Sequence, residues 1–187
     1  MQKGKSLDLF VYNKKYLMLL FALMLSIYLC VATAAEAPKL NLYSDLTPAV
    51  CTRFVDGDTA WFSAFGSEKE IKVRFIGIDS PEMGDENHQK GAYSDEASKY
   101  TKDALDKKIV FLEYDKEKFD QYGRHLCYIW FMDGTQLNYN IILNGLARVE
   151  LYKPNTKYKK NFYEAQDYAR ENALGIWSEK ASNYKGF

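Results

Sequence analysis

Three short segments of the chain place charged side chains among turn-forming residues beside predicted strands. They are Asp56-Gly57-Asp58-Thr59, the segment from Arg74 to Glu82, and Asp120-Gln121-Tyr122-Gly123-Arg124. Each alone has an ordinary interpretation, as an Asp-Gly hairpin turn, a solvated Ser-Pro turn or a polar loop. Together they supply carboxylates of the kind that bind Ca²⁺ or Mg²⁺, and two arginines suited to bidentate phosphate contact. This set suits hydrolysis of a phosphodiester, in which a further carboxylate takes a proton from water.

The second segment carries the most specific pattern. Arg74, Ile76 and Ile78 alternate along a predicted strand and would share one of its faces. A guanidinium among aliphatic side chains is costly unless it pairs with a carboxylate or a phosphate. Asp79 and Glu82 bracket a Ser-Pro turn at the end of this strand, so their carboxylates can converge on one point.

Several rival chemistries lack their characteristic residues. The two histidines, His88 and His125, form neither an H-E-x-x-H motif nor a Cys/His metal spacing, which argues against zinc hydrolases. The G-x-S-x-G elbow of serine hydrolases and the phosphate-binding G-x-x-x-x-G-K-[ST] loop are also absent from the sequence. Each histidine is therefore interpreted as a surface or capping residue.

Short β-rich runs and later helical segments must position these groups. Strands are expected at 50–55, 59–65, 71–78, 109–114 and 125–131, and helices from Ser94, over 137–144 before Gly145, and over 158–173. The first three strands have the spacing of an antiparallel meander. The pattern predicts an α+β fold with a closed or nearly closed five-stranded barrel.

The overall charge excludes a partner held by bulk electrostatics. The 187 residues are 47% apolar, and 25 basic residues balance 25 acidic ones. Residues 1–35 carry four lysines against one aspartate, so the 21 basic and 24 acidic residues that remain have a net charge of −3. A disordered polyelectrolyte or a histone-like binder does not fit this composition, and tight duplex binding is disfavoured.

The N-terminal sequence has the pattern of an export signal. The 20 residues from Tyr16 to Ala35 are uncharged and follow Lys14-Lys15, which predicts a signal peptide cleaved after Ala34 or Ala35, with a retained membrane anchor as the alternative. In either case the body is expected outside the cytoplasm. Residues 36–49 read as a linker. In the body, Cys51 and Cys127 could form a disulfide or remain buried free thiols.

Taken in order, the motifs resemble those of the thermonuclease, or staphylococcal-nuclease-like, family. The matching strings are V-D-G-D-T, R-x-x-G-I-D-S-P-E, D-Q-Y-G-R, G-L-A-R-V, Y-K-P-N and G-I-W-S, which together cover about residues 50–178. One such string is weak, whereas several in register are hard to obtain by chance. The resemblance implies a five-stranded OB-fold-type β-barrel with three α-helices, which agrees with the expected elements. It also implies Ca²⁺-dependent cleavage of DNA and RNA with little sequence preference, leaving 3′-phosphate ends.

The resemblance also implies a role for individual residues. Asp58 and Asp79 would bind Ca²⁺ with the backbone carbonyl of Ser80, Glu82 would be the general base, Arg74 and Arg124 would bind phosphate, and Tyr122 and Tyr152 would line the nucleotide pocket. Three departures imply weaker substrate binding: Gln121 replaces a lysine, Glu150-Leu151 replaces a longer stretch with another tyrosine, and the loop 83–93 is less basic.

These observations define the expected organisation. Residues 1–35 form a signal peptide or anchor, 36–49 a linker, 50–180 the nuclease-like domain and 181–187 a tail. The partners are DNA and RNA, single-stranded preferred, with a membrane contact only if the N-terminal segment is retained. A secreted or cell-envelope monomer without an obligate protein partner is expected. The alternative class is a catalytically weak or inactive OB-fold module that binds nucleic acid, which would not need the paired Asp58 and Asp79 or Glu82.

Overall fold

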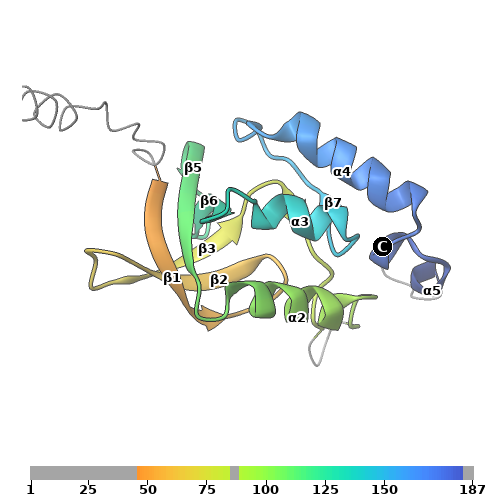
Figure 1. The fold of residues 1–187 in the computed structure, drawn as a ribbon, viewed down its shortest axis with the longest axis horizontal. Helices are drawn as coiled ribbons and strands as arrows, with labels where there is room; N and C mark the ends of the chain where they lie inside the picture. The colour runs from red at the N-terminus through yellow and green to blue at the C-terminus, as the bar shows by residue number, and fades with distance from the viewer. Residues whose placement is uncertain (1–45, 85–88, 183–187) are drawn as a thin grey trace, which may run out of the picture. The chain divides into compact units, whose positions relative to one another are not determined.

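The computed structural model describes residues 46–84 and 89–182, which belong to the compact unit Tyr43–Phe187. The predicted export segment, most of the linker, His88 and the end of the tail lie outside the described residues. Within the described ranges, no helix has the length and apolar character needed to cross a membrane. Figure 1 shows a barrel of strands with helices beside it.

Five strands close into a barrel in the order β1-β2-β3-β6-β5, which confirms the predicted architecture. They are β1 (Leu46–Phe54), β2 (Thr59–Ala64), β3 (Glu70–Phe75), β5 (Ile109–Phe119) and β6 (His125–Phe131). The first three form the predicted antiparallel meander, and β5 closes the barrel by pairing with β1. The pair β3–β6 is parallel, with Arg74 opposite Leu126. This pairing brings Arg74 beside the strand that follows Arg124.

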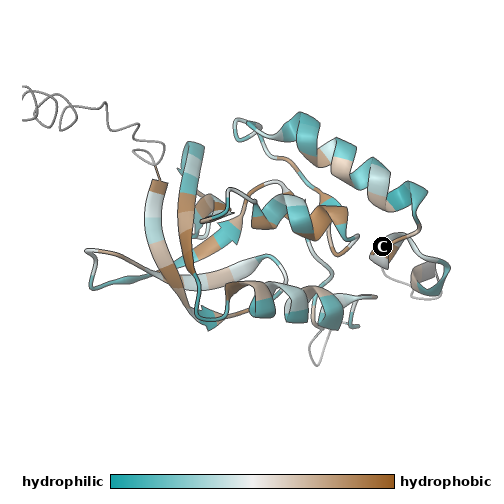
Figure 2. Ribbon diagram, viewed as in Figure 1, coloured by the Kyte–Doolittle hydropathy of each residue, from teal (hydrophilic) through white to brown (hydrophobic). Residues whose placement is uncertain are grey.

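Three helices pack beside the barrel, as predicted. They are α2 (Ser94–Leu105), α3 (Leu137–Leu143) and α4 (Lys159–Glu171), followed by the short η1 (Gly175–Trp177) and α5 (Glu179–Ser182). In Figure 2 hydrophobic residues concentrate on the strands and α3, whereas much of α4 is hydrophilic. Helix α4 contributes Phe162, Ala165 and Ala169 to the buried residues. The amphipathic spacing therefore indicates its packed face correctly.

A buried asparagine fixes the end of β3 against β6. The side-chain amide of Asn138 in α3 donates to the carbonyl of Ile76 at 2.9 Å, and its oxygen accepts from the backbone N–H of Ile129 at 2.9 Å. Asn138 is fully buried, so the loss of either bond would leave a polar group unsatisfied in the core. Helix α3 therefore fixes the backbone at Ile76, which leads to Asp79.

The strand predicted over 71–78 is interrupted. Strand β3 ends at Phe75, Gly77 adopts a φ of +82°, and the chain resumes as β4 (Ile78–Asp79), which pairs with β7 (Arg148–Val149). A Cβ at Gly77 would lie 2.5 Å from Cε2 of Phe162, so a glycine is needed for both reasons. The alternation of Arg74 with Ile78 on one strand face is therefore wrong.

Two further strand boundaries differ from those expected. Strand β1 begins at Leu46, so residues 46–49 belong to the barrel rather than to a linker, and β5 extends to Phe119.

Cys51 and Cys127 are both free thiols. They lie on β1 and β6, which are not neighbours in the barrel. Burial raises the pKa of both thiols.

The predicted glycine cap of α3 supports a stability prediction. Gly145 has a φ of +66°, its N–H donates to Ile142 at 2.8 Å, and a Cβ there would collide with the carbonyl of Leu174. We expect Gly145→Ala to lower the free energy of unfolding by about 3 kcal/mol, because backbone strain and a backbone collision add. Chemical denaturation measures the change.

The matched control is Gly134→Ala. Gly134 also has a positive φ, of +82°, but no atom lies within 4 Å of a Cβ built there. Only the conformational cost remains, which is about 1 kcal/mol. Equal losses in the two variants would contradict the argument from close packing.

Candidate active site

The turn before β2 docks a buried carboxylate against a distant segment. Asp58 accepts hydrogen bonds at Oδ2 from the backbone N–H and the hydroxyl of Ser80, at 2.8 and 3.0 Å. A Cβ on Gly57 would lie 2.6 Å from the Ser80 hydroxyl, so glycine permits this approach. The Asp-Gly sequence is thus more than a hairpin turn between β1 and β2, because its Asp58 also binds Ser80, the residue that follows β4.

The guanidinium of Arg74 spans two carboxylates that are far apart in sequence. Its Nη1 lies 3.2 Å from Oδ1 of Asp58, and its Nη2 lies 3.3 Å from Oδ1 of Asp79. Nη1 also donates to the backbone carbonyl of Ile78 at 2.7 Å. The partner that the sequence demanded for a strand arginine is therefore a pair of carboxylates.

This part of the site has an excess of negative charge. Burial raises the pKa of Asp79, and the charge of Glu150 raises it further, against the opposing effects of Arg148 and Arg74. Burial and the charge of Asp58 raise the pKa of Asp56 to about 6, with a smaller contribution from Glu82. Burial is the largest cause of both shifts, and the neighbouring carboxylates add to it.

Arg148 contacts the second carboxylate oxygen of Asp79. Its Nη2 lies 2.8 Å from Oδ2 of Asp79, across the short β4–β7 pair. The sequence motif G-L-A-R-V contains this arginine, but no role was predicted for it. Only the register of β4 against β7 reveals its partner.

The loop between β5 and β6 orients the second arginine. Asp120 accepts from Nε of Arg124 at 2.6 Å and from the backbone N–H groups of Arg124 and Tyr122, each at 2.9 Å. Burial alone would raise the pKa of Asp120, but these hydrogen bonds lower it overall. The Arg124 guanidinium also lies 5.5 Å from the centre of the Tyr122 ring. The polar loop is thus braced around Arg124.

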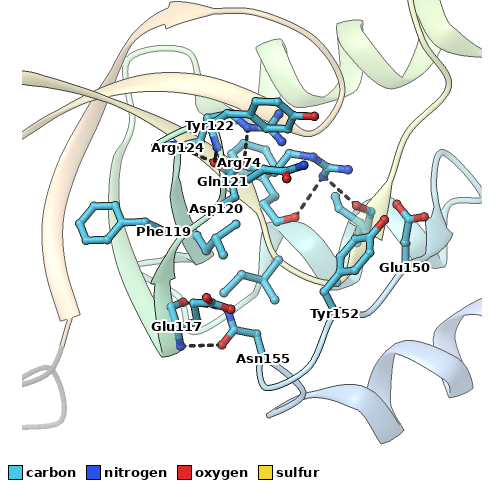
Figure 3. Close-up of a pocket in the computed structure, with 15 residues that line it drawn as sticks. Arg74, Glu117, Phe119, Asp120, Gln121, Tyr122, Arg124, Glu150, Tyr152 and Asn155 are labelled. Carbon is cyan, nitrogen blue, oxygen red and sulfur yellow. Dashed lines mark hydrogen bonds and ion pairs between the residues drawn. The ribbon is translucent and has the colours of Figure 1, made fainter.

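The two arginines face one pocket of about 450 Å³. Arg74, Arg124, Tyr122 and Tyr152 all line it, and Figure 3 shows Tyr152 beside Glu150 on one side of the opening. Both tyrosine side chains are largely exposed. A hydrogen bond to Glu150 raises the pKa of the Tyr152 phenol. The pocket therefore combines paired cations with open aromatic surfaces.

The remaining predicted residues do not line the pocket. Asp58 and Asp79 contact Arg74, and Ser80 is buried against Asp58. Glu82 is exposed, and its charge acts on Asp56. Among the described residues, no three His, Cys, Asp or Glu side chains form a metal-binding group. The predicted ligand set contains only two carboxylates, with a backbone carbonyl.

A closed five-stranded barrel with arginines and tyrosines around one pocket defines a staphylococcal-nuclease-like OB-fold protein. Residues 72–179 match the family model described as staphylococcal nuclease homologue. The chain is 40% identical to the thermonuclease of Staphylococcus hyicus over 126 residues, which is 67% of this chain and 73% of the relative. It is 33% identical to endonuclease YncB of Bacillus subtilis (strain 168) over 147 residues, 78% of this chain and 68% of the relative. The chain belongs to the staphylococcal nuclease family.

Proposed function

We propose that this chain is an exported Ca²⁺-dependent nuclease that cleaves DNA and RNA with little sequence preference and leaves 3′-phosphate ends. Its membership of a nuclease family, with relatives named thermonuclease and endonuclease, makes it a hydrolase of phosphodiester bonds. The observation that carries the finer proposal is the position of Arg74. Its guanidinium contacts Asp58 and Asp79 and lines the same pocket as Arg124.

The residues present fit a divalent cation. Asp58 and Asp79 both contact the guanidinium of Arg74, which brings their two carboxylates together. Carboxylate and carbonyl oxygens are the ligands that Ca²⁺ prefers. We assign the two carboxylates and the carbonyl of Ser80 as its ligands. When bound, the ion would offset the charge of the attacked phosphate.

The chain's own residues account for the other needs of the reaction. Arg74 and Arg124 would bind the scissile phosphate from two sides and stabilise the charge that grows in the transition state. Glu82 would take a proton from the attacking water, and its exposed carboxylate is open to solvent. The bond from phosphorus to the 5′ oxygen then breaks, which leaves the phosphate on the 3′ side.

The exposed rings explain the expected preference for single strands. The side chains of Tyr122 and Tyr152 are 75% and 71% exposed at the pocket. An aromatic face stacks on any base, but only on one that is not already stacked in a duplex. Substrate choice would therefore depend on strand accessibility rather than on sequence.

The proposal of export rests on the sequence. The uncharged run from Tyr16 to Ala35 after Lys14-Lys15 supports secretion or attachment to the cell envelope. Mass spectrometry of the exported protein would show whether this segment is removed. A full-length chain found only in the cytoplasm would contradict export.

The test of the function is digestion of plasmid DNA and of RNA with purified protein. We expect cleavage of both in Ca²⁺, loss of cleavage in EGTA, and its return when Ca²⁺ is restored. Product ends should need phosphatase treatment before a polymerase can extend them. Binding without cleavage would favour the inactive OB-fold module, and activity in EGTA would contradict the calcium assignment.

Asp58→Asn tests the metal site directly. The substitution removes one negative charge and retains a side chain of the same shape, so we expect the Kd for Ca²⁺ to rise about 100-fold. Isothermal calorimetry measures this Kd. Asp133→Asn, in the exposed turn after β6, is the control and should leave it unchanged. Unchanged Ca²⁺ binding by the Asp58 variant would place the ion elsewhere.

A further inference from the structure

A second group of aromatic side chains lies at the edge of the pocket, at the end of β5. Phe119 lines the pocket, yet its side chain is 51% exposed. It is the cross-strand partner of His125, and the two rings meet edge to face with centroids 4.8 Å apart. The ring of Phe119 is thus supported on one side while much of its surface faces solvent.

The support for Phe119 is itself held in place. Nδ1 of His125 lies 2.6 Å from the hydroxyl of Tyr114, and the rings of Tyr114 and His125 are 5.9 Å apart. The ammonium of Lys118 lies 5.5 Å from the centre of the Tyr114 ring. We name these four residues the Phe119 cluster. It joins exposed aromatic surface to a positive charge.

Phe119 lies on the side of the pocket away from Tyr152. Figure 3 shows Phe119 projecting outward on one side, with Tyr152 and Glu150 on the other. Arg74 and Arg124 lie between these ends. A chain of nucleotides that contacts both arginines can therefore extend towards either ring.

We propose that Phe119 is a further substrate-binding residue, on which a base of a single strand stacks at the edge of the pocket. Lys118 would contribute attraction to the adjoining phosphates. Aromatic rings with nearby cations along a strand are how proteins bind single-stranded nucleic acid without reading sequence. This inference rests on the proposed nuclease function, and it extends the binding site beyond the nucleotides held by Tyr122 and Tyr152.

Substrate length separates this role from others. We expect Phe119→Ala to raise KM about tenfold for a thymidine dodecanucleotide, as loss of one stacked base predicts, with kcat unchanged. KM for a trinucleotide should stay the same, because a short substrate held by Arg74, Arg124 and Tyr152 need not extend to Phe119. Phe119→Trp should restore the dodecanucleotide KM. Phe65→Ala is the matched control, since Phe65 is 56% exposed and does not line the pocket.

Binding measured without cleavage separates the two proposals. In EGTA, anisotropy of a labelled dodecanucleotide should show weaker binding to Phe119→Ala than to the wild type. An unchanged dodecanucleotide KM and Kd, or an equal rise for both lengths, would overturn the stacking role. Absence of cleavage by the wild type, with the binding difference intact, would overturn the nuclease function and leave the stacking site standing.

Discussion

Arg124→Ala is expected to lower kcat by about 10³-fold, as loss of an arginine that meets the charge of a phosphoryl transition state does in other enzymes. The hydrogen bond from Nε to Asp120 orients the guanidinium before substrate binds, so little reorganisation is needed during the reaction. The Arg124 side chain is only 28% exposed but lies at the pocket wall rather than in the core. The melting temperature should therefore change little.

Arg53→Ala is the matched control for this variant. Arg53 also lies over an aromatic ring, 4.5 Å from the centre of Trp61, but it does not line the pocket. It should retain wild-type kcat. Arg124→Lys should recover only part of the rate, because an ammonium lacks the bidentate fork of the guanidinium. A near-normal kcat in Arg124→Ala would remove this residue from the mechanism.

Arg74→Ala is expected to lower both turnover and stability. The Arg74 side chain is 15% exposed, and its guanidinium pairs with both Asp58 and Asp79, so its loss leaves two partly buried carboxylates without this partner. We expect a loss of about 3 kcal/mol in the free energy of unfolding in EGTA, together with a fall in kcat of about 10³-fold. This double effect distinguishes Arg74 from Arg124.

Thermal unfolding in EGTA and in Ca²⁺ tests the pairing. Calcium should raise the melting temperature of Arg74→Ala more than that of the wild type, because the ion would compensate the carboxylates that the guanidinium no longer contacts. Arg148→Ala removes the other arginine partner of Asp79. The Arg148 side chain is 44% exposed, so this substitution should lower the free energy of unfolding by less. Equal calcium shifts in all three proteins would show that the ion binds away from these carboxylates.

Local signals in the sequence were sufficient for most of the framework. The strand over 125–131 and the glycine that ends α3 follow from residue pattern and from the positive φ that glycine accepts. Residue pattern also predicted the three helices, and the buried positions of α2 and α4 recur at helical spacing. Beyond the meander of the first three strands, the sequence predicted no order for the strands around the barrel, and only the tertiary structure gives it.

The errors lie where a distant segment overrides local preference. The run 71–78 reads as one strand, but it breaks at Gly77, where the ring of Phe162 in α4 packs against the turn. Likewise, Phe119 reads as a loop residue, and only its pairing with His125 makes it part of a strand at the pocket. Neither the contact of Gly77 with Phe162 nor the pairing of Phe119 with His125 can be predicted from the hydrophobic periodicity of the sequence.

By itself, the sequence determined the inventory: two arginines, paired carboxylates and tyrosines, in motifs whose order resembles one family of nucleases. The tertiary structure decided which of these groups meet. Closure of the barrel and the parallel β3–β6 pair bring Arg74 and Arg124 to one pocket, and the turn at Gly77 brings Asp79 to the guanidinium that Asp58 already contacts. Hydrophobic period reports only neighbours along the chain, whereas these distances depend on strand register and on packing between segments far apart in sequence.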